Sequence, residues 1–355
     1  MKPFSASPFS SKTQGTFIIA EAGVNHNGDL AMARALIDGA AQAGADAVKF
    51  QMFEPALLAS AATPLAAYQE AGEANGNRPL KTQIDLLEAL ALPKADFLAL
   101  QAYAEQAGIQ FLCTPFDDAS AVFLHETMGL PLLKISSGEL TNLPFLRFLG
   151  EMNTPLILST GMATLAEVEA AVQAVWQKHR PSLALLHCVS AYPAAAETIN
   201  LRAMRTLQKA FPDCAIGYSD HTLGIHIPVA AVALGAGIIE KHFTLDKTLP
   251  GPDHKASLSL EELTDMVRAI RETEAALGDG IKQPNPIEAD CIRVARKSLV
   301  ARHALPADHR LTLEDLMAKR PGTGISPADL HLVLGRRLKR AIAQDELLQP
   351  QMLES

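Results

Sequence analysis

An alternation of short apolar runs with longer helical patterns constrains the fold of this chain more than any other feature. Eight apolar runs predict strands, and helical periodicity separates them. Eight strand-plus-helix units within about 280 residues are typical of a (β/α)8 TIM barrel. The predicted strands are 17–20, 45–51, 111–113, 132–135, 156–158, 183–188, 215–218 and 237–240, and the helices include 30–43, 95–107, 119–128, 165–179, 201–211, 227–234 and 260–277.

An open doubly wound sheet is the alternative, but it needs a glycine-rich phosphate turn after its first strand. The first loop reads EAGVNHNG and lacks the GxGxxG spacing. Segment 53–78, rich in Ala, Gly and Asn, is predicted to be a long functional loop over the barrel mouth. A Pro-Asn-Pro run at 284–286 marks a linker, so we assign 1–283 to the barrel, 284–295 to the linker and 296–355 to a small, mostly β domain that packs on a barrel.

Composition excludes several classes of protein. The formal charge of −8, without a long basic run, argues against a nucleic-acid partner. The first sixteen residues lack an apolar core and no later apolar run approaches eighteen residues, which argues against a signal peptide and a membrane partner. The four cysteines form no CxxC pair, so we expect reduced thiols in a cytoplasmic protein.

Polar residues follow all eight predicted strands, and in a barrel these strand ends converge on one face. His221 and His242 follow neighbouring strands. Neutral imidazoles bind divalent cations, and two of them leave open positions for substrate oxygens. We therefore expect this pair to hold a metal ion, although a single histidine of this kind is more often an ordinary loop residue.

Lys49 and Lys134 each lie between apolar neighbours, where a lysine is costly to bury unless it meets an anion. Hydroxyls at strand ends, at Thr114, Ser136, Ser137, Ser159 and Thr160, would add neutral donors to an anion pocket. The alternative is that the lysines reach solvent and the hydroxyls cap helices. Among the carboxylates, Glu21 and Glu139 are candidates for proton transfer, Asp253 could bind a polyol, and Asp220 could orient His221 or cap the next helix.

Ten short strings along the chain form a recognisable set. They are IAEAGVNHNGD, AVKFQ, CTPFD, KISSGEL, ILSTGMA, LLHCVSAYP, GYSDHTLG, EKHFTLD, PGPDH and KRPGTGI. This set resembles the sialic acid synthases, and the resemblance extends from near residue 17 to the C-terminus. It implies condensation of phosphoenolpyruvate with N-acetylmannosamine or a related N-acyl hexosamine, giving N-acetylneuraminate or a related nonulosonic acid and phosphate. It also implies a barrel followed by an antifreeze-like (SAF) domain, in a homodimer whose C-terminal domains are swapped.

The resemblance also implies roles for individual residues. The metal, Mn²⁺ or Mg²⁺, would be held by His221 and His242. Glu21, Glu139 and Lys134 would be catalytic, with Glu139 the preferred proton acceptor. Arg320 would reach the acyl group of the sugar in the other subunit. Phosphoenolpyruvate would contact Lys49, Thr114, Lys134, Ser137, Ser159 and Ser190, and the sugar would contact Gln51, Tyr192 and Asp253.

Two departures from the family pattern concern the sugar. Ser190 stands where N-acetylneuraminate-forming members carry Asn, and Val294 where a phenylalanine is expected, so a legionaminic or pseudaminic acid precursor is an alternative substrate. A Schiff-base aldolase using Lys49, Lys134 or Lys241 is a different enzyme class. A non-enzymatic carbohydrate-binding role for the C-terminal module is disfavoured, because the barrel retains both histidines, the lysines and the carboxylates.

Overall fold

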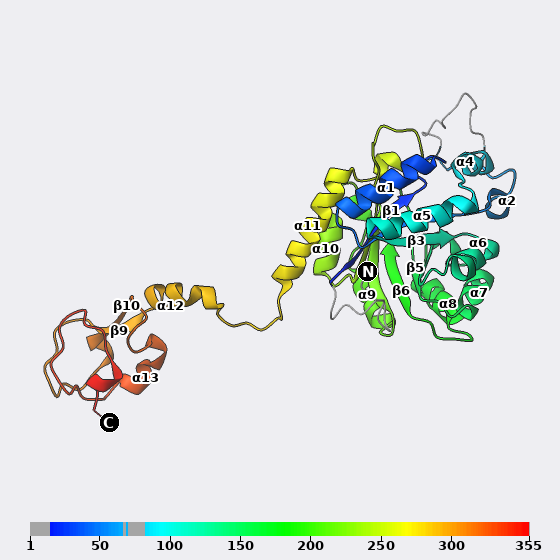
Figure 1. Ribbon diagram of the computed structural model, residues 1–355. Helices are drawn as coiled ribbons and strands as arrows, with labels where there is room; N and C mark the ends of the chain where they lie inside the picture. Colours follow the sequence, from blue (N-terminus) through cyan, green and yellow to red (C-terminus); the bar gives the residue numbers. More distant parts are fainter. Residues whose placement is uncertain (1–14, 67–68, 70–81, 355) are drawn as a thin grey trace. The chain divides into compact units, whose positions relative to one another are not determined.

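The computed structural model describes residues 15–66, 69 and 82–354. The chain forms two compact units that divide between Gly278 and Asp279 (Figure 1). Of the predicted loop at 53–78, residues 67–68 and 70–78 lie outside the described part. The part that is described contains one short helix, α2 (Pro55–Leu58).

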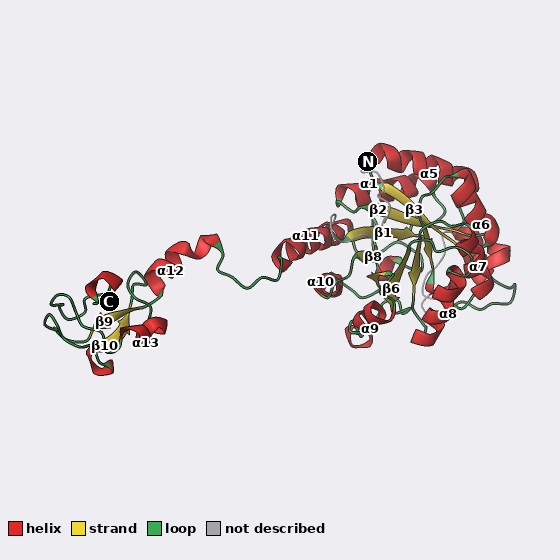
Figure 2. Ribbon diagram, turned by 90° about the horizontal axis from the view of Figure 1, so that it is seen from below, coloured by secondary structure: helices red, strands yellow, loops and turns green. Residues whose placement is uncertain are grey.

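The first unit is the predicted barrel. Its eight parallel strands follow the order β3-β2-β1-β8-β7-β6-β5-β4, and β3 and β4 also contact each other, so the sheet closes into a ring. Figure 2 shows the helices on the outside of this ring. The strands are β1 (Phe17–Gly23), β2 (Ala47–Met52), β3 (Gln110–Pro115), β4 (Leu133–Ile135), β5 (Leu156–Ser159), β6 (Leu183–Cys188), β7 (Ala215–Asp220) and β8 (Ile238–His242).

Several helices of the barrel begin at side chains that satisfy the free amides of their first turn. Asp29 accepts from two amides of α1, and Thr82, Thr164 and Ser259 form capping boxes at α4, α8 and α11. The helices are α1 (Leu30–Gln42), α4 (Gln83–Leu90), α5 (Lys94–Ala107), α6 (Asp118–Val122), α7 (Leu143–Glu151), α8 (Leu165–Val175), α9 (Ala203–Ala210), α10 (His226–Ala233) and α11 (Leu260–Leu277).

Two helices depart from their predicted bounds more than the others do. The helix predicted at 165–179 ends at Val175, because Trp176 turns out of it and its indole Nε1 donates to the carbonyl of Pro181 at 3.0 Å. The helix predicted at 119–128 divides into α6 and a π-helical turn at Phe123–Thr127. Helical periodicity does not distinguish these tighter or wider turns from a continuous α-helix.

The inside of the barrel is filled by apolar side chains at its lower level. They come from seven of the eight strands or the residues just before them, and each is fully or almost fully buried, while Ala215 of β7 is partly buried and packs against them. Because strand side chains alternate between faces, the residue two positions further along each strand also points inward. The inner apolar residues are Ile19, Ala47, Leu112, Leu132, Ile157, Ala184, Leu186 and Ile238.

The second unit has a small apolar core of its own, of which Leu299, Leu316 and Leu338 are members. β9 (Ser298–Ala301) and β10 (Leu316–Lys319) pair antiparallel, and isolated bridges join further extended segments. The apolar piece LHLVLG contains the short helix α13 (Leu330–Val333), and the predicted linker contains α12 (Ala289–Ala295). In the part of the chain that is described, no helix has both the length and the apolar character needed to cross a membrane.

Candidate active site

Polar side chains replace apolar ones inside the barrel as the strands approach their C-terminal ends. Two residues after Ile19 comes Glu21, and two residues after Ile238 comes Glu240. The same step leads to Lys49 on β2 and to Ser159 on β5. Since alternate residues share a face, the strand period brings these polar groups to one end of the barrel interior.

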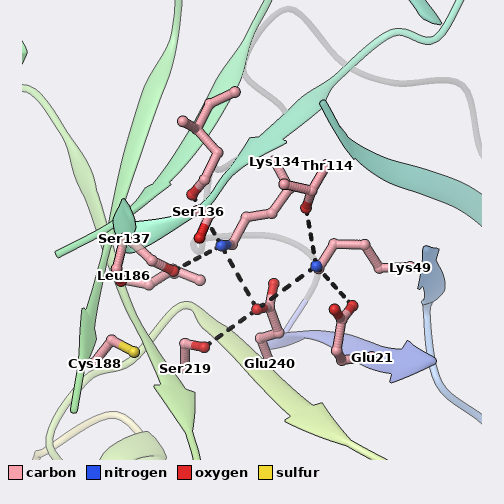
Figure 3. Close-up of polar contacts among 12 residues, drawn as sticks. Glu21, Lys49, Thr114, Lys134, Ser136, Ser137, Leu186, Cys188, Ser219 and Glu240 are labelled. Carbon is pink, nitrogen blue, oxygen red and sulfur yellow. Dashed lines mark hydrogen bonds and ion pairs between the residues drawn. The ribbon is translucent and has the colours of Figure 1, made fainter. Parts of the chain in front are cut away.

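Two buried lysines and two buried carboxylates form the centre of the site, and we call Glu21, Lys49, Lys134 and Glu240 the lysine cluster (Figure 3). Lys49 Nζ lies 2.7 Å from Glu21 Oε2 and 4.0 Å from Glu240 Oε1. Lys134 Nζ lies 3.6 Å from the same Glu240 oxygen. The sequence predicted that an anion meets these lysines; in the structure two carboxylates already do so.

Hydroxyls complete the shell around the two ammonium groups, and their predicted role as donors to an anion stays a prediction. Lys49 donates to Thr114 Oγ1 at 3.0 Å, and Lys134 donates to Ser159 Oγ at 2.7 Å. Lys134 also donates to the carbonyl of Ile135 at 3.1 Å. The lysines therefore do not reach solvent; both are at most 3% exposed.

The environment shifts the pKa values of the two carboxylates in opposite directions. Burial raises the pKa of Glu21, although Lys49 opposes the effect. Burial would also raise the pKa of Glu240, but Lys134 and Lys49 outweigh it and hold that pKa below its ordinary value. A pair of carboxylates separated in this way suits one to carry a proton while the other stays charged.

The pKa values of the two lysines also shift in opposite directions. Burial lowers the pKa of Lys134, against the attraction of Glu240. For Lys49, burial acts in the same direction, but Glu21 and Glu240 outweigh it and the pKa is raised. An anion beside Lys134 would favour its charged form.

A glycine allows two serines to approach each other beside the lysine cluster. Ser137 Oγ accepts from the amide of Gly161 at 2.9 Å. A Cβ at Gly161 would lie 2.4 Å from Ser190 Oγ and 2.9 Å from Ser137 Oγ. Both hydroxyls therefore occupy space that a side chain at position 161 would fill.

The two predicted metal-ligand histidines lie side by side. The ring centroids of His221 and His242 are 5.4 Å apart. His221 Nδ1 lies 2.7 Å from the carbonyl of Val189, which can only accept, so this nitrogen carries the proton and Nε2 keeps a free lone pair. His242 Nδ1 is buried and has no hydrogen-bond partner among the described residues.

Burial keeps both rings neutral. It lowers the pKa of His221, and it lowers that of His242 well below its ordinary value, with His221 and the lysines adding to the effect. A neutral ring with a free lone pair is the form that binds a cation. The residues present therefore fit a divalent ion held by two nitrogens.

The residues predicted for the sugar surround the histidines. Asp253 Oδ2 lies 3.7 Å from His242 Nδ1, and burial together with Glu21 raises the pKa of Asp253 to about 6. The ring centroid of Tyr192 is 4.1 Å from that of His221. Gln51 donates to Glu21 Oε1 at 3.0 Å, which connects this group to the lysine cluster.

Two further predicted residues, Glu139 and Arg320, bond to neighbours that do not belong to the lysine cluster. Glu139 is buried in the short turn after β4 and accepts from Asn142 Nδ2 at 2.8 Å. Arg320 belongs to the second unit, where its Nε donates to the carbonyl of Ala295 at 3.1 Å. Their catalytic and sugar-binding roles stay predictions.

Glu240 and Ser219 belong to the site without having been predicted, and Ser219 Oγ donates to the central Glu240 Oε1 at 3.2 Å. The signal that could have found Glu240 is its position two residues before His242, on the same face of β8. The suggestion that Asp220 caps the next helix is wrong, because the N-cap of α10 is Ile225. The ring of His221 bonds to the carbonyl of Val189, so any influence of Asp220 on this histidine acts through the backbone.

Comparison with known proteins identifies both units. Residues 36–282 match the NeuB family, and residues 296–354 match the SAF domain. The chain is 45% identical over 326 residues to N,N'-diacetyllegionaminic acid synthase of Legionella pneumophila, covering 91% of this chain and 90% of the relative.

A second relative is also a synthase by name, and a solved structure shares the fold. N-acetylneuraminate-9-phosphate synthase of Mus musculus is 37% identical over 343 residues, covering 96% of this chain and 93% of the relative. The crystal structure of N-acetylneuraminic acid synthetase from Leptospira borgpetersenii, in complex with citrate, superposes with a TM-score of 0.68 at 37% identity and covers 79% of this chain and 90% of that one. The chain therefore belongs to the NeuB family of sialic acid synthases and is an enzyme of the synthase type.

Proposed function

We propose that this enzyme condenses phosphoenolpyruvate with an N-acyl hexosamine to give a nonulosonic acid and inorganic phosphate. The observation that carries the proposal is the meeting of two buried lysines, their hydroxyl partners and two neutral histidines at one end of the barrel. One end of this site suits the phosphate and carboxylate of phosphoenolpyruvate, and the other suits a polyol.

The lysine cluster would bind the anionic substrate. Lys49 and Lys134 supply positive charge, and the hydroxyls of Thr114 and Ser159 already bond to them. Ser137 and Ser190 add two further hydroxyls across Gly161. Glu240 Oε2 is buried without a hydrogen-bond partner in the described chain, so it could accept from a hydroxyl of the sugar or from water.

His221 and His242 would hold a divalent cation, Mn²⁺ or Mg²⁺. Within residues 15–66, 69 and 82–354, no cluster of three His, Cys, Asp and Glu side chains could hold a metal, so the remaining positions would go to water and substrate oxygens. When bound there, such an ion supplies Lewis-acid polarisation of the sugar aldehyde.

Proton movement would fall to the buried carboxylates. Burial raises the pKa of Glu21, which favours its protonated form before substrate enters. The bond from Asn142 fixes one oxygen of Glu139, leaving the other available to accept a proton from water that adds to the substrate. Lys134 would keep the phosphate and carboxylate in place while the C–O bond to phosphate breaks.

For the sugar, we favour the precursor of N,N'-diacetyllegionaminic acid. Two synthases with this name are 45% identical to the chain, against 36–37% for the N-acetylneuraminate-9-phosphate synthases of Homo sapiens and Mus musculus. Removing the three carbons of phosphoenolpyruvate from the product leaves a six-carbon aldehyde sugar with two acetamido groups. N-acetylmannosamine, giving N-acetylneuraminate, is the second candidate, and a pseudaminic acid precursor is a third.

The experiment is phosphate release from phosphoenolpyruvate with a panel of N-acylated mannosamine and bacillosamine-type sugars, with and without Mn²⁺. We expect the highest kcat/KM with a diacetamido sugar and no release without the metal. Release with none of these sugars would refute the synthase proposal. A higher kcat/KM with N-acetylmannosamine would refute the sugar assignment alone.

The same assay tests the Schiff-base alternative. Lys241 has no free donor position toward the barrel interior, because it is fully buried and bonded to Asp220 and the Thr222 carbonyl. Lys49 and Lys134 remain open to this chemistry. Activity that survives EDTA, with borohydride trapping of substrate on either lysine, would favour the aldolase.

We also propose a homodimer in which Arg320 binds the acyl group of sugar in the other subunit. Arg320→Ala should raise the KM for the sugar more than the KM for phosphoenolpyruvate. Mixing Arg320→Ala with His242→Ala should restore part of the activity, because a mixed dimer would contain one intact site. No recovery in verified mixed dimers would refute the swap.

A further inference from the structure

We infer that a buried ion pair on the outer face of the strands, Asp220 with Lys241, positions the two histidines of the candidate metal site. We call it the outer pair. Asp220 immediately precedes His221, and Lys241 immediately precedes His242. The inference rests on the proposed function, because it assigns the outer pair to the metal site of that reaction.

Strand alternation places the outer pair behind the site. On β8, Glu240 points inward to the lysine cluster, so Lys241 points to the opposite face. On β7, Ser219 points inward to Glu240, and Asp220 points outward beside Tyr218. Tyr218 belongs to the apolar layer that also includes residues of α10 and α11.

The outer pair connects β7 to β8 at the last residue pair of the ladder between these strands. The ladder between these strands runs through Tyr218↔Ile239 and Ser219↔Glu240 to Asp220↔Lys241. The histidines come next in each chain segment. The distance between them therefore depends on how firmly this last level is held.

Asp220 is saturated with donors. Its Oδ2 accepts from Lys241 Nζ at 2.5 Å and from Thr222 Oγ1 at 2.9 Å. Its Oδ1 accepts from Tyr218 Oη at 2.6 Å and from the Thr222 amide at 3.1 Å. Lys241 Nζ also donates to the carbonyl of Thr222.

This network encloses one histidine in particular. Tyr218 and Thr222 both donate to the carboxylate of Asp220, and Lys241 donates to the Thr222 carbonyl. His221 lies within this short segment. Fixing the backbone on both sides of His221 fixes the direction in which its ring leaves the chain. Lys241 anchors the whole segment to β8, one residue before His242.

A purely stabilising role is a weaker explanation of the outer pair. Removing two charges from water is costly, and well-packed apolar residues often replace a buried ion pair with no loss of stability. Groups behind metal ligands, by contrast, commonly set ligand orientation, and their removal weakens metal binding by about 10- to 100-fold. The position beside both ligands agrees with the second role.

The test uses the double variant Asp220→Leu/Lys241→Met in the full chain, which leaves no unpaired buried charge. We expect it to fold and to bind Mn²⁺ about 10- to 100-fold more weakly in isothermal titration without substrate. In the phosphate-release assay its kcat should recover as Mn²⁺ is raised, while the KM for phosphoenolpyruvate stays within about 2-fold of wild type. A purely structural role would not produce rescue by the metal.

The matched control is Glu151→Leu/Lys178→Met, which removes an exposed ion pair of 3.3 Å and should leave Mn²⁺ affinity unchanged. A folded outer-pair variant with wild-type Mn²⁺ affinity would overturn the inference. If the double variant does not fold, Tyr218→Phe and Thr222→Val each remove a donor to Asp220; unchanged affinity in both would overturn it equally.

The outcomes separate the two proposals. A wild-type protein that binds Mn²⁺ but releases no phosphate with any sugar refutes the proposed function, and Mn²⁺ affinity still decides the role of the outer pair. A wild-type protein that binds no Mn²⁺ overturns the inference, because the histidines would then form no metal site to position.

Discussion

The lysine cluster and the outer pair are both buried assemblies of lysines and carboxylates, yet they differ in how completely their polar atoms are satisfied. Every oxygen of Asp220 has two donors. In the lysine cluster, Glu240 Oε2 has no partner among the described residues, and Glu240 Oε1 is 3.6 Å and 4.0 Å from its two lysines. Burial alone does not distinguish a binding site from a scaffold, whereas unused hydrogen-bonding capacity does.

The difference has a physical reason. A scaffold group gains most when its partners offset its desolvation in the folded protein itself. A group that must bind substrate keeps part of this capacity free until the ligand arrives. We expect substitutions of the inner groups to lower activity directly, and substitutions of the saturated groups to act through stability and, for the outer pair, through the placement of the histidines.

The largest effect should come from His242→Ala. The variant removes one of two nitrogen ligands and should lower metal-dependent phosphate release by about 1,000-fold, because Lewis-acid stabilisation contributes several kcal/mol. Circular dichroism should show an unchanged fold. His125→Asn, which loses only a contact with Thr154 on the barrel exterior, serves as the histidine control. Unchanged turnover in His242→Ala would refute the ligand role.

Lys134→Met and Lys241→Met compare the two assemblies directly. Lys134→Met should lower kcat/KM by about 100-fold with a smaller loss of stability, because Glu240 keeps Lys49 at 4.0 Å and the hydroxyl of Ser219 as partners. Lys241→Met leaves Asp220 buried without its cation and should lower the free energy of unfolding by about 3–5 kcal/mol. Kinetics and urea unfolding of both variants are the measurements. The reverse pattern would contradict the distinction.

Gly161→Ala should act on substrate binding alone. The added Cβ would displace the hydroxyls of Ser190 and Ser137, so we expect about a 10-fold higher KM for phosphoenolpyruvate and a similar melting temperature. Gly138→Ala is the matched control, because its Cβ would have no neighbour nearer than 3.9 Å. Equal KM values in the two variants would remove Ser137 and Ser190 from the anion site.

The smallest effect concerns Asp315, a saturated carboxylate of the second unit. Burial would raise its pKa, but bonds from His309 and Thr312 outweigh this and lower it to about 2. Because the folded pKa is below the unfolded value, the stabilisation is present above about pH 4 and is lost as the pH falls toward 2.

Asp315→Asn should therefore lower the free energy of unfolding by about 2 kcal/mol at neutral pH and flatten its dependence between pH 2 and 4. Thermal unfolding across this pH range measures both. The kcat of the variant should equal that of wild type. A pH dependence like that of wild type would show that another group is responsible.

The strands and most of the site residues were predictable because they depend on local pattern. Eight apolar runs separated by helical segments predict the barrel, and the period of two within a strand determines that Glu21 and Lys49 point inward. The motif strings identified the family. The sequence could not show that Glu240 lies at the centre of the site, because the lysines it meets come from β2 and β4, far away in the chain.

The sequence by itself determined which residues carry charge and on which face of each strand they lie. The tertiary structure decided which of them meet. Closure of the ring brings β1 beside β8, so that Glu21 is level with His242, and the register of β7 against β8 sets Asp220 level with Lys241. Strand period is a local property of the backbone, whereas strand order and register are properties of the assembled sheet. The division between a saturated outer pair and a partly unsatisfied inner cluster depends on that order and register.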